Sequence, residues 1–120
     1  MNDYAVQLTM TSILDHLKQI VGPEGWVSSI DSIPYLTEPR GNYHGKAAAV
    51  LRPASTKEIA QIVHLCAETK TTIVPQGGNT GLVGGSTPSK DGTQILINLG
   101  RMNRILDLNA NARTVSVEAG

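Results

Sequence analysis

The chain has 120 residues, 40% of them hydrophobic, and its 10 basic and 10 acidic side chains give a formal net charge of zero. This length supplies at most one domain, and the neutral balance argues against a protein that binds nucleic acid by neutralising phosphates. No segment approaches the ~20 apolar residues of a membrane span, and the single cysteine and the first ten residues indicate a cytoplasmic protein without a signal peptide.

The first predicted element is a helix over Thr11–Val21, where apolar residues recur at helical spacing behind Thr11 or Ser12 as N-cap. Gly22 and Pro23 are expected to end it. Residues 25–45 contain scattered Pro, Gly and polar residues and predict a connector. We therefore divide the chain into residues 1–37, a helix and connector, and residues 38–120, the incomplete N-terminal part of a binding domain.

A strand–helix–strand unit is predicted next. Residues 46–53 form a short apolar strand, and Ser55 with Glu58 is the pattern of a capping box that opens a helix to about Thr69. Residues 71–75 are a second, β-branched strand. The apolar face of the helix is expected to carry Ile59, Ile62, Val63 and Cys66. Such a βαβ unit implies parallel strand pairing.

Three further strands are predicted over residues 93–99, 104–108 and 113–118, separated by short polar turns. The fold class is therefore α+β, a small parallel βαβ piece that leads into a strand-rich part. Because the last strand is followed by nothing that could cover it, we interpret the chain as the front part of a larger protein.

A glycine-rich segment follows the second strand and reads PQGGNTGLVGGS over residues 75–86. Its backbone can approach a ligand closely, and successive N–H groups in such a turn form an anion-binding nest. The segment contains no basic residue, so a phosphate would be held by backbone amides and by the side chains of Gln76, Asn79, Thr80 and Ser86. This favours a diphosphate that stays bound as part of a cofactor over one that is hydrolysed.

Two familiar phosphate motifs and a flexible linker are the alternatives for this segment. A Rossmann GxGxxG motif would need glycine where Asn79 stands, and a P-loop would need a lysine that the segment lacks. A linker would avoid apolar residues, whereas Leu82 and Val83 can anchor this loop to a core.

The strings VLRPASTKEIAQIVHLCAE, TIVPQGGNTGLVGGS, ILINLGRMNRI and TVSVEAG together resemble the FAD-binding domain of the vanillyl-alcohol-oxidase, or PCMH-type, flavoprotein superfamily. Within it they are most similar to the D-2-hydroxyglutarate dehydrogenase group. Glycolate-oxidase-type relatives usually carry an Arg after the proline, where this chain has Gln76. The resemblance implies that residues 38–120 form the first βαβ subdomain and the start of a second, strand-rich subdomain. It also implies cofactor-binding positions at Pro75, Gln76, Gly77, Gly78, Asn79, Thr80, Gly81, Gly84, Gly85, Ser86 and Gly120.

The resemblance implies an FAD-dependent dehydrogenase that oxidises D-2-hydroxy acids, such as 2-hydroxyglutarate or lactate, to 2-oxo acids and passes the electrons to a further acceptor. The family's catalytic base and metal ligands lie outside these residues, so no catalytic or metal residue is assigned and the chain alone is expected to be inactive. The alternatives are a non-enzymatic module that binds a nucleotide or anion, and a sugar or alditol oxidase of the same superfamily. A homodimer is left open.

The FAD is expected to be bound non-covalently. Relatives that tether the flavin in this loop carry a histidine where this chain has Asn79, and an amide cannot form that bond. Cys66 is expected to be a buried, inert thiol, and His64 to be solvated. Arg101 and Arg104 are expected to be exposed in turns.

Two substitutions follow from the loop. Gly78→Val is expected to abolish flavin binding because of a positive φ, and Gln76→Ala to weaken it only mildly.

Overall fold

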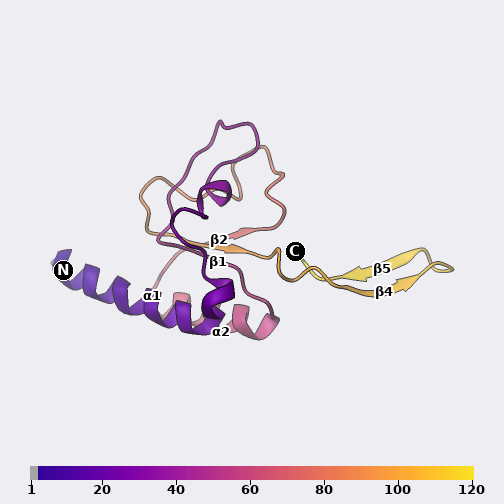
Figure 1. Cartoon of the computed structure of the whole chain (residues 1–120), viewed down its shortest axis with the longest axis horizontal. Coiled ribbons are helices and arrows are strands. Elements are labelled where there is room, and N and C mark those ends of the chain that lie inside the picture. Colours follow the sequence, from indigo (N-terminus) through magenta and orange to yellow (C-terminus); the bar gives the residue numbers. More distant parts are fainter. Residues whose placement is uncertain (1–2) are drawn as a thin grey trace.

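The protein consists of a small three-stranded sheet with helices on one face and a separate hairpin that extends from it (Figure 1). A computed structural model describes residues 3–120, with side chains described from Met10 onward. In chain order the elements are α1 (Asp3–Gly25), η1 (Ile33–Tyr35), β1 (Ala49–Leu51), α2 (Thr56–Glu68), β2 (Ile73–Gln76), β3 (Ile95–Asn98), β4 (Ile105–Asn109) and β5 (Thr114–Val117). The α+β class is confirmed, and every predicted helix and strand is present.

The main sheet has the strand order β1-β3-β2, and both pairings are parallel. The parallel direction of β1 and β2 is as expected, but these two strands do not pair with each other. The later strand β3 lies between them, and all four of its residues are buried. A strand of continuous apolar residues such as Ile95–Ile97 gains most from burial on both faces, which places it in the centre of the sheet.

Helices α1 and α2 cover one face of this sheet, while the connector and the glycine-rich loop lie on the other (Figure 1). Ala49 and Leu51 of β1 and Ile95 and Ile97 of β3 point to the helices. The helices contribute Ile13, Leu17, Val21, Ile62 and Cys66 to the same core. Because α1 packs into the core of the sheet, residues 1–37 and 38–120 share one hydrophobic core.

Helix α1 differs from its prediction at its start. It begins at Asp3 rather than behind Thr11 or Ser12, since residues 3–10 contain no glycine or proline that would end it. The predicted stop is confirmed in geometry: Gly22 has a φ of 66° and interrupts the helical backbone. Pro23 then begins one more turn that ends at Gly25.

The N-terminus of α2 is capped as the sequence predicts, with one change of partner. Ser55 Oγ accepts a hydrogen bond from the Glu58 N–H (3.2 Å), while Glu58 Oε2 accepts from the N–H of Ala54 (2.8 Å) instead of that of Ser55. The predicted apolar face is only partly buried. Ile62 and Cys66 are in the core, whereas Val63 is 46% exposed and Leu65 packs against the core in its place.

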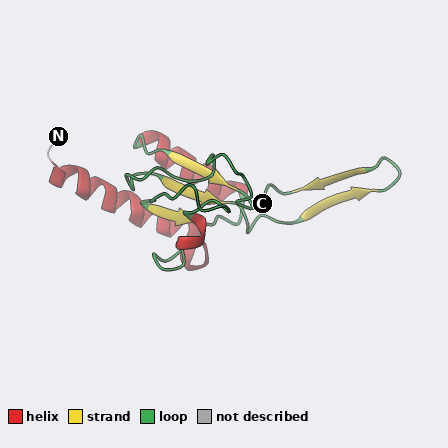
Figure 2. Cartoon of the chain, turned by 90° about the horizontal axis from the view of Figure 1, so that it is seen from above, coloured by secondary structure: helices red, strands yellow, loops and turns green. Residues whose placement is uncertain are grey.

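The antiparallel β4–β5 hairpin extends away from the body (Figure 2). All residues of both strands are exposed, including the large apolar side chains Ile105, Leu106, Leu108, Val115 and Val117. At its base, Glu118 binds the Arg104 guanidinium at 2.7 Å and accepts from the Arg104 N–H at 3.0 Å. The hydrogen bonds from Arg104 lower the pKa of the Glu118 carboxyl.

Ser55→Ala removes the cap of α2 and is expected to lower the free energy of unfolding by about 1 kcal/mol. The backbone N–H of Glu58, in the first turn of the helix, would lose its acceptor, the Ser55 hydroxyl. Chemical denaturation of the two proteins measures the difference. Thr56→Ala, at an exposed neighbouring position, is the matched control and should change stability by much less; equal losses in both variants would contradict the assignment of Ser55 as the cap.

Candidate functional site

The carboxyl ends of the three parallel strands meet at one edge of the sheet, where ligands bind in open α/β sheets. The glycine-rich loop leaves this edge after Gln76 and returns to the opposite edge at Ile95, without a helix of its own. It lies on the face of the sheet that the helices leave free, beside the connector that contains η1 (Figure 1).

Gln76 is the first polar group of this edge, and its side chain is buried at 2% exposure. Its Nε2 donates to the carbonyls of Tyr35 (2.9 Å) and Ser86 (3.0 Å), and its Oε1 accepts from Asn98 Nδ2 (3.0 Å). One amide therefore joins the connector, the end of the loop and the neighbouring strand.

Asn79 makes a second connection between the loop and the connector. Its Nδ2 donates to the carbonyls of Thr37 (2.9 Å) and Pro34 (3.4 Å), and its Oδ1 accepts from Ser86 Oγ (3.0 Å). Its backbone has a φ of 54°, a conformation that asparagine tolerates better than most residues. The Asn79 side chain thus holds the middle of the loop against residues 34–37.

Asn98 belongs to this network and was not predicted as a site residue. It is 7% exposed, its Nδ2 donates to the Gly77 carbonyl (3.0 Å) as well as to Gln76, and its Oδ1 accepts from the Gly100 N–H (3.0 Å). The available signal was an amide directly after the apolar run Ile95–Ile97, at the carboxyl end of a predicted strand.

These contacts determine which groups of the loop are free for a ligand. The side-chain amides of Gln76 and Asn79 and the hydroxyl of Ser86 are engaged within the protein. Among the described residues, by contrast, no carbonyl or side chain accepts a hydrogen bond from the backbone N–H groups of residues 78–86. The loop therefore presents backbone donors, and its polar side chains fix its shape.

The glycines leave room beside this backbone. A Cβ at Gly77, Gly81 or Gly85 would meet no atom within 4 Å, and one at Gly78 would meet only Thr80 Cγ2, at 3.8 Å. The expectation of a positive φ at Gly78 is wrong. In this loop a positive φ occurs at Asn79 and at Gly84.

Gly84 holds the second half of the loop against the connector. Its φ is 77°, and a Cβ there would lie 3.2 Å from the Tyr43 ring. Glycine is therefore required at this position for its conformation and for the close approach of the ring.

The two remaining predicted residues lie at the margins of the loop. Pro75 is an exposed residue of β2 and is not among the loop residues. At Gly120 the N–H donates to the Met102 carbonyl (2.9 Å), and an added Cβ would clash with the Leu99 carbonyl. Gln76 and Asn79 both bond to Ser86, and Gly120 lies against Leu99, whose N–H donates to the Gln76 carbonyl (2.9 Å).

The other candidate side chains agree in part with their predictions. Cys66 is 1% exposed, and burial raises the pKa of its thiol, so it is the inert residue expected. His64 is exposed as predicted and lies 3.3 Å from Glu68.

The two arginines that were expected to be exposed in turns differ from each other. Arg104 is exposed, but the side chain of Arg101 is only 23% exposed because it contacts the Arg52 carbonyl and Glu24. Within the described residues no group of His, Cys, Asp or Glu could hold a metal ion.

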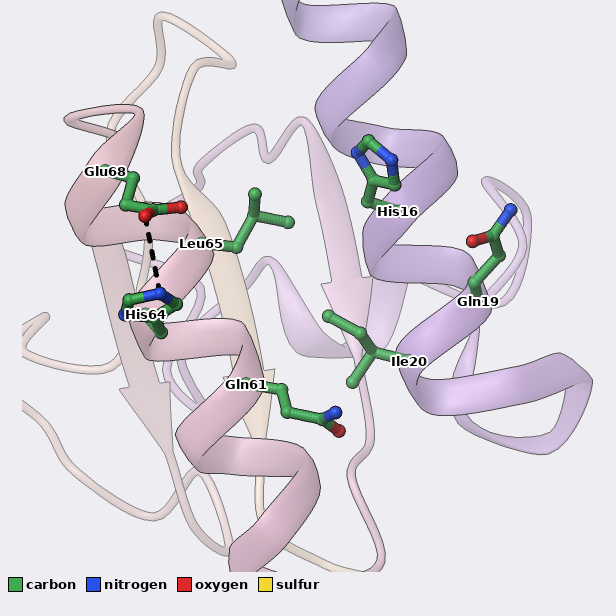
Figure 3. A pocket seen from close by; sticks show the side chains of 7 residues that line it. All are labelled: His16, Gln19, Ile20, Gln61, His64, Leu65 and Glu68. Carbon is green, nitrogen blue, oxygen red and sulfur yellow. Dashed lines mark ion pairs between the residues drawn. The ribbon is translucent and has the colours of Figure 1, made fainter.

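A cavity of about 480 Å³ lies between α1 and α2, on the helix side of the molecule (Figure 3). His16, Gln19 and Ile20 line it from α1, and Gln61, His64, Leu65 and Glu68 from α2. The sheet separates it from the glycine-rich loop.

No helix in the described part of the chain is long and apolar enough to cross a membrane.

Comparison with known proteins identifies the family. The profile of a family described as FAD binding domain matches residues 47–120, which include both flanking strands and the whole glycine-rich loop. The chain belongs to the FAD binding domain family. FAD is therefore the cofactor of this domain, as the sequence resemblance implied.

The relatives of this FAD binding domain include D-2-hydroxyglutarate dehydrogenases. The mitochondrial enzyme of Arabidopsis thaliana is 35% identical over 89% of this chain and 19% of its own length, and that of Bos taurus is 40% identical over 63% and 14%. Glycolate oxidase subunit GlcD of Bacillus subtilis is 32% identical over 90% of this chain and 23% of its own length. The chain therefore spans between 14% and 23% of the length of these relatives.

Solved structures confirm the PCMH-type fold. Alkyldihydroxyacetonephosphate synthase superposes with a TM-score of 0.72 at 21% identity, over 88% of this chain and 21% of that chain. p-Cresol methylhydroxylase superposes with a TM-score of 0.67 at 22% identity, over 84% and 20%.

Gln76→Ala is expected to lower the free energy of unfolding by roughly 1–3 kcal/mol, since it leaves the buried Asn98 amide and two carbonyls without a partner. The mild effect expected for this substitution concerns flavin binding, which is a different quantity, and it stays a prediction. Thermal or chemical unfolding of the apoprotein measures the loss. Thr80→Ala, at an exposed loop position, is the control and should change stability by less than about 0.5 kcal/mol. Equal stability of both variants would contradict the bracing role of Gln76.

Proposed function

We propose that this FAD binding domain serves a dehydrogenase that oxidises D-2-hydroxy acids, of the 2-hydroxyglutarate or lactate type, to 2-oxo acids. The observation that carries the proposal is the loop of residues 76–86 in a chain whose relatives include D-2-hydroxyglutarate dehydrogenases. When bound, FAD supplies the two-electron acceptor for oxidation of the CH–OH group, and a further electron acceptor is then required. The residues described here supply binding and orientation.

The loop fits the diphosphate of FAD in its donors and in its space. The backbone N–H groups of residues 78–86 have no partner among the described residues, and the glycines leave the approach to them open. An array of oriented amides attracts an anion without an ammonium group. We assign the diphosphate contacts to the backbone of Gly77–Gly81 and Gly84–Ser86, with Gln76 and Asn79 as the residues that hold this backbone in place.

Two alternatives are distinguished by simple measurements. A non-enzymatic anion-binding module would show no bound flavin, so the absorption spectrum of the purified protein tests it. A sugar or alditol oxidase would turn over a sugar alcohol in preference to D-2-hydroxyglutarate or D-lactate. Turnover of the three substrates by the natural full-length protein decides between these reactions.

Gly78→Val is expected to weaken FAD binding by about tenfold or more, because a branched side chain would occupy the space beside the loop N–H groups. The fold should persist, since the φ of Gly78 is not positive and only Thr80 Cγ2 lies within 4 Å of a Cβ. Flavin fluorescence gives the dissociation constant, and thermal unfolding of the apoprotein tests the fold. Ala60→Val, at an exposed position of α2, is the control for the added side chain; an unchanged FAD affinity in Gly78→Val would count against the assignment.

The flavin is expected to be held non-covalently. Asn79 occupies the position of the tethering histidine, its amide is bonded to the connector, and the thiol of Cys66 is buried on the helix side of the sheet. Acid denaturation should therefore release all the flavin into the supernatant. Flavin that stays on the precipitated chain, mapped by peptide mass to residues 70–90, would show this expectation to be wrong.

The location and assembly of the protein also remain proposals. A single cysteine favours a reducing compartment and supports a cytoplasmic location. The plant and bovine relatives are named as mitochondrial proteins, so fractionation of the source cells is the test. The exposed apolar side chains of β4–β5 support an assembly contact, such as that of a homodimer.

A further inference from the structure

Arg52, Asn98 and Gln76 form one polar row across the carboxyl ends of β1, β3 and β2. Gln76 is in register with Asn98, and Arg52 follows Leu51, which is in register with Ile97. Since Leu51 and Ile97 point into the helix core, the next residue on each strand points to the other face, where the glycine-rich loop lies. The row therefore faces the cofactor side of the sheet.

The two amides of this row have no donor left for a ligand. Gln76 donates to two carbonyls, and Asn98 donates to Gln76 and to the Gly77 carbonyl. Arg52 differs: its Nε is buried, and it has no hydrogen-bond partner among the described residues. A buried N–H without an acceptor is unfavourable, and for a charged group the penalty is larger.

Both backbone groups of Arg52 are hydrogen-bonded. Its N–H donates to the Gly25 carbonyl (2.7 Å), and its carbonyl accepts from Arg101 Nη1 (2.9 Å). The position that a Cβ of Gly100 would take is 3.6 Å from Arg52 Nη2 and 2.9 Å from Asn98 Oδ1. The guanidinium therefore lies over Gly100, next to the amide that binds Gly77.

The charge of Arg52 is also uncompensated. Arg101, its neighbour, lies 3.3 Å from the Glu24 carboxylate, whereas no carboxylate of the described residues forms an ion pair with Arg52. Adjacent strands lie about 4.8 Å apart, so the Arg52 backbone is only about 10 Å from that of Gln76, where the loop begins. A permanent cation thus stands beside a loop that contains no basic residue.

We propose that the Arg52 guanidinium binds a phosphate oxygen of the FAD diphosphate. The inference rests on the proposed function and adds a charged, specificity-determining contact to the backbone donors of the loop. A guanidinium remains charged at all physiological pH values and presents N–H donors in a fork that matches phosphate oxygens. Such an oxygen would supply an acceptor for the terminal Nη donors of Arg52, for which no hydrogen bond or ion pair is seen among the described residues.

The test compares two flavins in the apoprotein of the natural full-length protein. Riboflavin carries the same ring system as FAD but no phosphate, and quenching of flavin fluorescence gives both dissociation constants. Arg52→Met keeps much of the side-chain length and removes the charge. FAD affinity should fall by about tenfold to a hundredfold, as expected for a hydrogen bond between charged groups, while riboflavin affinity stays the same. Arg52→Lys should fall between the two, because it keeps the charge and loses the fork.

The controls separate this inference from its alternatives. Arg104→Met removes an exposed arginine of the hairpin base and should leave both affinities unchanged. Equal affinity of the wild type and Arg52→Met for FAD, or an equal loss for FAD and riboflavin, would overturn the phosphate contact. If Arg52→Met does not fold, Arg52→Lys carries the same comparison. A wild-type protein that binds riboflavin and FAD equally would overturn this inference and the diphosphate assignment of the loop, and one that binds neither flavin would overturn the proposed function as a whole.

Discussion

The hydrogen-bonded amide pair of Gln76 and Asn98 is the contact on which the arrangement of the glycine-rich loop depends. The chain passes from β2 to β3, two neighbouring parallel strands, through residues 77–94 without a helix. Such a crossover usually contains a helix that packs on the sheet and orders the connection. Here the order comes from side-chain amides instead, since the Gln76–Asn98 pair reaches Tyr35, Gly77 and Ser86 from a buried position.

The same principle extends into the connector, which becomes a wall of the site although it contains only one short helical turn. Asn79 binds two of its carbonyls, and Glu38 shapes its tight turn. The Glu38 carboxylate is 1% exposed and accepts from the N–H groups of Arg40 (2.9 Å) and Asn42 (2.6 Å), which lowers its pKa. Side chains therefore hold the turns of the connector and of the glycine-rich loop and bond to their carbonyls. The backbone N–H groups of residues 78–86 keep no acceptor among the described residues.

The sequence predicted the helices and strands better than it predicted which strands pair and which side chains bond to each other. Helix α2, its Ser55 cap and all five strands follow from local patterns, because capping and hydrophobic periodicity are encoded within a few residues. The place of β3 between β1 and β2 depends on competition for burial across the whole sheet, which no local pattern records. The bracing contacts of Gln76 and Asn79 also escape a local pattern, because their acceptors Tyr35 and Thr37 lie 41 and 42 positions away in the chain. Glycine spacing located the loop, but only tertiary structure separates the side chains that brace it from the backbone N–H groups that have no acceptor among the described residues.

Strand alternation explains why this small sheet can combine a stable core with a polar site. Along β1 and β3, Leu51 and Ile97 point to the helices, and the residues that follow them point to the loop. Neighbouring residues on a strand therefore face opposite sides of the sheet. A shift of β3 by a single residue would turn Asn98 toward α1 and α2 and bury it there. The hydrogen bonds of Asn98 to Gln76 and Gly77 oppose such a shift, because the amide would lose both partners among apolar side chains. The packing of Leu51 and Ile97 against the helices thus places Arg52 and Asn98 on the opposite face of the sheet. Asn98 in turn holds Gln76, the residue after which the glycine-rich loop begins.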